Sequence, residues 1–142
     1  PAVLKERAHE YFDLPPGADA PFMLLTPQAR ETHRGEIPAV VHVDGSCRVQ
    51  TVDREVHPLF HRLIEAFGEL TGVPVLVNTS FNVRGEPIVC TPKDAWNTFV
   101  STGIDALAIG RCLVLEKPGK VDFEAGTRRS IALEAGEITA DA

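Results

Sequence analysis

Residues 73–90, VPVLVNTSFNVRGEPIVC, are the stretch from which we predict the fold and the function of this chain. Its first part, VPVLV, is short, apolar and β-branched, which predicts a buried strand. The small polar residues NTSFN follow directly, and ligands of open α/β sheets collect at such strand ends. Small hydrogen-bond donors suit an anion. A tight turn without a ligand explains the same residues, so both interpretations stay open.

The composition is that of an ordinary globular protein. The chain has 142 residues, enough for one core, and is 44% hydrophobic and 24% charged. Its net charge of -6 argues against a nucleic-acid partner but permits a local basic pocket for a small anion. No apolar run approaches membrane-spanning length and no signal pattern is present, so we expect a cytoplasmic protein without a membrane partner.

The cysteines and the first residue carry two further expectations. Cys47, Cys90 and Cys112 are widely spaced and form no CxxC pair, which favours buried, reduced thiols over a zinc site. The chain begins with Pro1 and not with Met, so we expect a fragment of a longer protein.

The residues before the central strand predict a mixture of helices and short strands. Asp44-Gly45 is a hairpin signal, and it places Arg48 and Gln50 on one face of the second arm, either as solvated surface or as a pocket wall for an anion. The expected elements are an amphipathic helix at 3–12, a short strand at 22–25, a mobile loop at 26–36, hairpin arms at 37–43 and 47–52, and a helix at 58–70.

The helix at 58–70 has the clearest pattern. Its apolar stripe is expected to face inward, and Pro58 and Gly72 suit its start and stop. His57 and His61 are expected on its solvent side, because no third metal ligand accompanies them.

A second helix is predicted after the central strand. Thr91 and Asp94 fit a capping box, and we expect the apolar side chains between Ala95 and Val100 to point inward. The runs at 106–110 and 112–116 are two strands or one bent strand, and residues 118–142 are expected to form a loosely packed tail. The alternation predicts an α/β (α+β) fold, a mixed twisted β-sheet with packed helices and parallel crossovers.

Two stretches carry a resemblance to a known family. HVDGSCRVQTV at 42–52 and TGVPVLVNTSFNVRGEPIVCTPKDAWNTF at 71–99 resemble the C-terminal part of the O-carbamoyltransferases of nodulation factors, cephamycin and tobramycin. The opening residues 1–14 and the PFMLL segment at 21–25 are similar too, so the resemblance covers about 1–116 and implies one domain over 1–117. It implies a YrdC-like domain, here incomplete.

The resemblance also implies the chemistry. In that family this domain activates carbamoyl phosphate with ATP and Mg²⁺, giving carbamoyl-adenylate and pyrophosphate. An N-terminal domain that carries iron then passes the carbamoyl group to a hydroxyl of a natural product or sugar. That domain is absent from these 142 residues.

The family motif assigns roles to residues of this sequence. Arg48 and Ser80 are the expected catalytic residues, because Ser80 and Asn82 match a Ser-x-Asn motif and Arg48 matches a phosphate- or carbamoyl-binding arginine. Glu86 is expected to brace Arg84. The expected substrate- and nucleotide-binding residues are His42, Arg48, Asn78, Thr79, Ser80, Asn82 and Arg84, and no residue is assigned to a metal.

One departure limits the expected activity. The family's cation-rich runs (GPRALGxR-like and VKxRExFRPF-like) are not in this sequence, so we expect the chain alone not to turn over. The alternative is a non-catalytic nucleotide-binding or interaction module derived from the same domain. A carbamoylation step of hydrogenase maturation is disfavoured, because the zinc-finger cysteine pairs of that system are missing.

Overall fold

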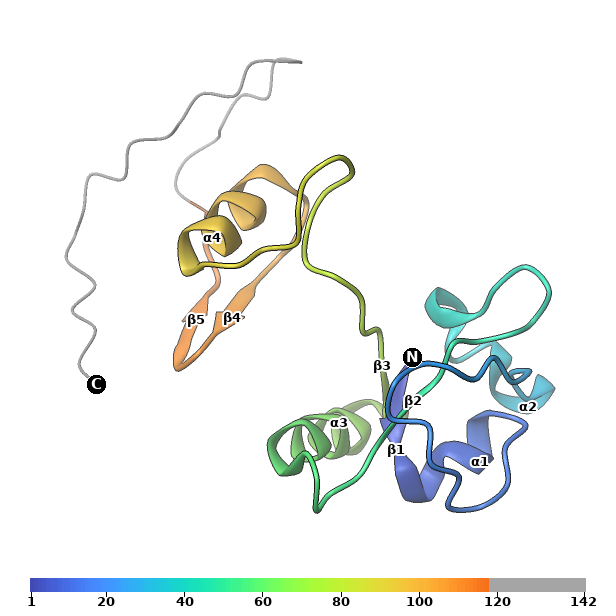
Figure 1. Cartoon of the computed structure of the whole chain (residues 1–142). Helices are drawn as coiled ribbons and strands as arrows, with labels where there is room; N and C mark the ends of the chain where they lie inside the picture. Colours follow the sequence, from blue (N-terminus) through green and yellow to red (C-terminus); the bar gives the residue numbers. More distant parts are fainter. Residues whose placement is uncertain (118–142) are drawn as a thin grey trace. The chain divides into compact units, whose positions relative to one another are not determined.

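The computed structural model describes residues 1–117, which divide into two compact units (Figure 1). The first unit is Pro1–Ser80 and the second begins at Phe81. The expected tail at 118–142 lies outside the described residues. None of the helices within 1–117 is both long and apolar enough to span a membrane.

A three-stranded mixed sheet organises the first unit. Its order is β2 (Gln50–Val52), β1 (Ala2–Leu4), β3 (Val75–Leu76). The central strand β1 pairs with β2 in parallel and with β3 antiparallel. This confirms the α+β class with a mixed sheet. The expected parallel crossover is wrong, because β2 and β3 run in opposite directions and flank β1 instead of pairing.

The predicted helix at 3–12 is wrong in its first half. Residues Ala2–Leu4 form the central strand, followed by the 3-10 turn η1 (Lys5–Arg7) and the short helix α1 (Ala8–Tyr11). All three strand residues are buried, because successive side chains of a strand point to opposite faces and both faces of this sheet are covered. A strand that is covered on both faces needs a continuous apolar run, whereas a helix with one buried face needs apolar residues on that face only.

The two faces of the sheet have separate cores. On one face Val3 and Val75 pack with Tyr11, Phe12 and other side chains of the segments after β1. On the other face Leu4 and Val52 pack against Ile64 of helix α3 (Pro58–Thr71). Figure 1 shows α3 beside the strands and α1 next to α2 (Glu31–Arg34).

Helix α3 begins and ends as predicted but faces differently. Pro58 occupies its first turn, and Gly72 closes it with a left-handed φ of 82°. The predicted inward stripe is largely exposed: Leu59 is 79% and Leu70 is 87% accessible. The face that packs on the sheet instead carries His61, which was expected on the solvent side and is fully buried.

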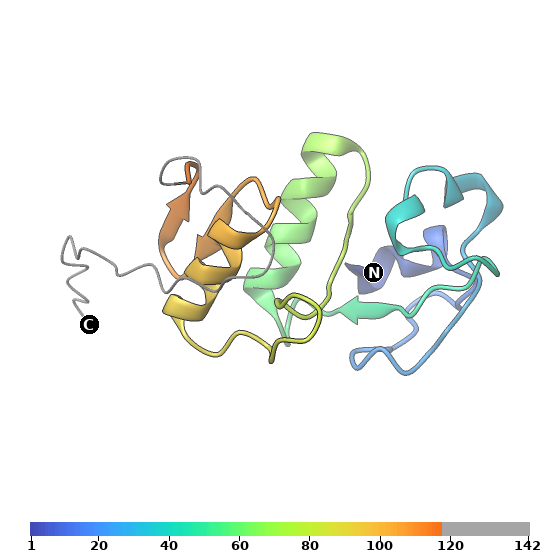
Figure 2. The ribbon, with the colours of Figure 1, turned by 90° about the horizontal axis from the view of Figure 1, so that it is seen from above.

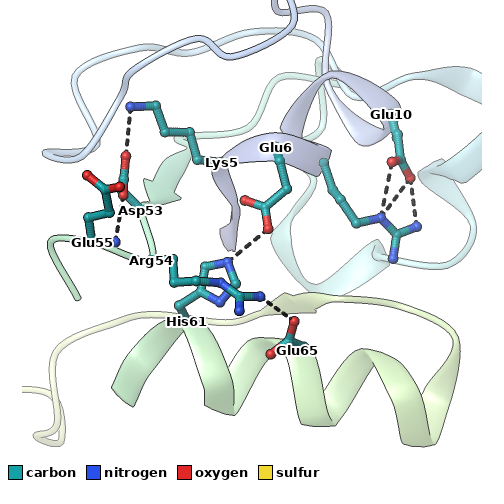
Figure 3. Close-up of polar contacts among 9 residues, drawn as sticks. Lys5, Glu6, Glu10, Asp53, Arg54, Glu55, His61 and Glu65 are labelled. Atoms are coloured by element: carbon teal, nitrogen blue, oxygen red, sulfur yellow. Dashed lines mark hydrogen bonds and ion pairs between the residues drawn. The ribbon is translucent and has the colours of Figure 1, made fainter. Parts of the chain in front are cut away.

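His61 takes part in one of several polar contacts around α3, η1 and the end of β2 (Figure 3). Its Nε2 lies 2.9 Å from Glu6 Oε1, which gives the buried ring a polar partner on η1. Lys5 Nζ donates to Asp53 Oδ2 at 2.9 Å and so ties η1 to the residue after β2. These contacts explain why a histidine lies on the inner face of α3.

Three predictions for residues 22–52 are wrong. Residues 22–25 form no strand, and only an isolated bridge joins Leu25 to Val49. The expected mobile loop contains α2 and the buried Ala29. The first hairpin arm is replaced by the 3-10 turn η2 (Pro38–Val40), although the turn at Asp44-Gly45 forms as predicted, with Gly45 N donating to His42 O at 2.9 Å.

The second unit consists of α4 (Pro92–Ser101) and the hairpin of β4 (Leu107–Ile109) and β5 (Cys112–Val114) (Figures 1 and 2). The capping box of Thr91 and Asp94 is present, and Ala95, Phe99 and Val100 are buried, so this helix is confirmed. The two apolar runs are two strands. Cys90 and Cys112 are exposed and only Cys47 is buried, so two of the three buried thiols were wrongly predicted.

Candidate functional site

The register of the sheet brings two of the predicted residues, Arg48 and Asn78, to the same end of it. Ala2 is paired with Gln50 on one side and with Leu76 on the other. The start of β2 and the end of β3 therefore flank the start of β1. Arg48 precedes Gln50 by two residues and Asn78 follows Leu76 by two, so both lie just beyond the strands at this end of the sheet.

A cavity of about 320 Å³ lies at this end of the sheet. Three predicted site residues line it: His42, Arg48 and Asn78. The guanidinium of Arg48 forms no ion pair within residues 1–117, so its charge is available to a ligand. The remaining lining residues are Pro1, Met23, Ala39, Val40, Val41 and Val77.

A turn at Asp44–Ser46 lies next to the part of the cavity that His42 and Arg48 line. Asp44 Oδ1 accepts from Ser46 Oγ at 2.7 Å and from Ser46 N at 2.9 Å. These two hydrogen bonds hold the pKa of the Asp44 carboxyl below its usual range. The turn stands between His42 and Arg48 in the chain, and it therefore sets how both approach the cavity.

The turn should weaken in acid. Because the pKa of Asp44 is lower in the folded chain, its carboxylate stabilises the fold above the unfolded pKa of about 4, and this contribution is lost as the pH falls through the folded pKa. We expect Asp44→Ala to lower the free energy of unfolding at neutral pH and to have a smaller effect in acid. Urea unfolding across the pH range measures this.

Asp105→Asn is the matched control, since Asp105 is exposed and forms no hydrogen bond or ion pair within residues 1–117. A penalty for Asp44→Ala that stays the same at every pH would contradict the role given to the carboxylate.

The other predicted residues lie outside the cavity. Thr79 and Ser80 are exposed at the end of the first unit and do not line it. Asn82 belongs to the second unit, where its Nδ2 donates to Glu86 O at 3.0 Å and to Val83 O at 3.3 Å. For Asn82, these hydrogen bonds agree with the interpretation of NTSFN as a tight turn without a ligand. Arg84 is exposed in the same turn.

Two residues near the cavity were not among the predicted site residues. Gln50 accepts from Asn78 Nδ2 through Oε1 at 2.6 Å and donates from Nε2 to Pro21 O at 3.0 Å. Met23, which lines the cavity, has φ of 55°, a conformation that side chains other than glycine rarely adopt. The strand pattern placed Gln50 on the face of Arg48, whereas nothing in the sequence marks the strain at Met23.

The residues around the cavity do not form a protein-held magnesium site. No carboxylate lines it, and residues 1–117 contain no group of three or more His, Cys, Asp or Glu side chains that fits a metal ion. Magnesium is held by carboxylates and by the phosphates of a substrate. The cavity offers only a cation and neutral groups, so its residues do not fit a Mg²⁺ ion held by the protein.

Comparison with known proteins places the chain in a family. The sequence profile described as "Carbamoyltransferase C-terminus" matches residues 1–116. This chain belongs to that carbamoyltransferase family. It is 42% identical over 122 residues to nodulation protein NolO of Bradyrhizobium diazoefficiens, which covers 85% of this chain and 22% of that protein.

Two further relatives agree with this family. Nodulation protein NolNO of Sinorhizobium fredii is 44% identical over 118 residues, 82% of this chain and 17% of that protein. Nodulation protein U of Bradyrhizobium diazoefficiens is 45% identical over 85 residues, 60% of this chain and 15% of that protein. The chain thus spans between 15% and 22% of the length of these three relatives.

Proposed function

We propose that this chain is the acyl-phosphate-activating part of an ATP-dependent O-carbamoyltransferase. The observation that carries the proposal is the cavity at the sheet end, where Arg48 and Asn78 meet in a member of the carbamoyltransferase family. A guanidinium binds phosphate oxygens bidentately, and a neutral amide binds the uncharged acyl end. About 320 Å³ suits one small phosphorylated substrate.

The proposed reaction joins the carbamoyl group to AMP. Carbamoyl phosphate loses its phosphoryl group to water as inorganic phosphate, and the carbamate oxygen attacks the α-phosphorus of ATP. The bond from that phosphorus to the bridging oxygen breaks, so carbamoyl-adenylate and pyrophosphate leave. Arg48 would offset the negative charge that two phosphorylated substrates bring together. Mg²⁺ would enter bound to ATP.

The chain alone is proposed to bind weakly and not to turn over. Arg48 is the single Lys or Arg side chain that lines the cavity within residues 1–117, and the sequence has a net charge of -6. One guanidinium opposes only part of the charge of ATP and carbamoyl phosphate. We therefore propose that further cations come from parts of the protein outside this sequence, as does the iron-containing domain that would pass the carbamoyl group to a hydroxyl of a natural product or sugar. The reaction would take place in the cytoplasm, which supplies both substrates.

Pyrophosphate release tests the proposal. Two proteins are each given carbamoyl phosphate, ATP and Mg²⁺: this chain, and a longer polypeptide that contains it and has the length of its relatives. We expect release that depends on carbamoyl phosphate with the long polypeptide, and a rate at least 100-fold lower with the chain, about 3 kcal/mol of transition-state stabilisation. Equal rates would contradict the need for outside cations, and no release from either would contradict the proposed function.

A further inference from the structure

A row of amide groups at the sheet end determines which atoms Asn78 offers to the cavity. The row starts at the carbonyl of Pro21, passes through the side chain of Gln50 and ends at Asn78. The first link is 3.0 Å long and the second is 2.6 Å long, slightly shorter than a typical N–H···O hydrogen bond. The orientation of each amide follows from the one before it.

The first link fixes Gln50. A backbone carbonyl only accepts hydrogen bonds, so the group of Gln50 that faces Pro21 O must be the NH₂ group Nε2. The carbonyl Oε1 of Gln50 then points to Asn78. An oxygen there requires a donor, and this places Nδ2 of Asn78 against Gln50.

The second link leaves an acceptor for the ligand. Asn78 lines the cavity and Gln50 does not, and it is the Nδ2 of Asn78 that contacts Gln50. The carbonyl Oδ1 is the other end of the same planar group. Asn78 forms no other side-chain hydrogen bond within residues 1–117, so Oδ1 remains available.

The cavity therefore offers a ligand both hydrogen-bond donors and a hydrogen-bond acceptor. Arg48 has only donors and suits the phosphate end of a ligand, whereas Asn78 Oδ1 suits a ligand group that carries N–H. Carbamoyl phosphate has both, with its NH₂ at the acyl end. Acetyl phosphate has the same phosphate but carries a methyl group, which cannot donate and would leave Oδ1 without a partner.

We propose that Asn78 Oδ1 recognises the NH₂ group of a carbamoyl phosphate, and that Gln50 is a positioning residue that holds this oxygen toward the ligand. The inference rests on the proposed function, and it adds the group that separates a carbamoyl from an acetyl substrate.

The test is the ratio of two affinities, measured by titrating the isotope-labelled 142-residue chain with carbamoyl phosphate and with acetyl phosphate in NMR spectra. Both ligands carry the same phosphate, so a change in charge alters both affinities alike and leaves the ratio unchanged. We expect the native chain to prefer carbamoyl phosphate about fivefold to tenfold, the usual size of one neutral hydrogen bond.

The variants separate recognition from positioning. Asn78→Ala should bring the ratio close to one, while Asn97→Ala, an exposed asparagine of α4, should keep it. Gln50→Met lets the Asn78 amide rotate and should lower the ratio about threefold.

The outcomes are distinct. A native chain that binds both ligands equally, or an unchanged ratio in Asn78→Ala, overturns the recognition by Oδ1 and leaves the proposed function standing. A ratio in Gln50→Met as high as that of the native chain overturns the positioning role of Gln50. A native chain that binds acetyl phosphate but not carbamoyl phosphate overturns both the inference and the proposed function.

Discussion

Phe99→Ala is expected to unfold much of the second unit. Phe99 is fully buried in a small core with Ala95, Val100 and Leu107. Its ring lies 6.1 Å from that of Trp96, and Lys117 Nζ lies 5.0 Å from its centroid. Replacing a buried phenylalanine by alanine lowers the free energy of unfolding by about 3–5 kcal/mol. A whole domain is stable by only about 5–15 kcal/mol, so this is a large share.

Trp96 reports this change, because it is the only tryptophan of the chain. We expect urea unfolding followed by its fluorescence to shift strongly to lower urea in Phe99→Ala. Leu113→Ala is the matched control: Leu113 of β5 is 64% exposed, so its removal should change the midpoint little. Equal shifts in the two variants would show that Phe99 does not hold this core together.

Helices with local signals could be predicted from the sequence. Thr91 and Asp94 close a capping box, and Gly72 takes the left-handed conformation that ends α3. These signals act between residues a few positions apart, so they appear in the sequence itself. The same holds for the turn at Asp44-Gly45.

Features that depend on distant partners could not be predicted in this way. Val3 and Leu4 fit a helical pattern with the residues that follow, but their pairing with Thr51, Val52 and Val75 makes them a strand. The apolar pattern of α3 shows which faces can be buried, and the sheet selects the face with His61 because Glu6 supplies its polar partner there.

The candidate site also has features that could be predicted from the sequence and features that depend on distant partners. Strand alternation predicts Arg48 and Gln50 on one face, and the end of β3 brings Asn78 to the same end of the sheet. The amide contact between Gln50 and Asn78 follows only from the sheet order, which the sequence does not state. Asn82 shows the converse, since its side chain braces the turn that follows it.

Arg48→Ala is expected to lower the affinity of the chain for carbamoyl phosphate about 100-fold. A hydrogen bond to a charged group contributes about 1.5–3 kcal/mol, and the two oxygens of a phosphate can both be held by one guanidinium. Arg48→Lys keeps the charge but loses the fork, so a loss of about tenfold is expected. Phosphorus and amide shifts in NMR titrations measure these weak affinities.

Arg62→Ala provides the matched control for charge. Arg62 is exposed on α3 and does not line the cavity, so its removal changes the net charge by the same unit outside the site. Added salt should weaken binding by the native chain more than binding by Arg48→Ala, because the contact with Arg48 is electrostatic. If Arg48→Ala and Arg62→Ala lose the same affinity, Arg48 acts only through the overall charge, and the cavity at the sheet end is not where the phosphate binds.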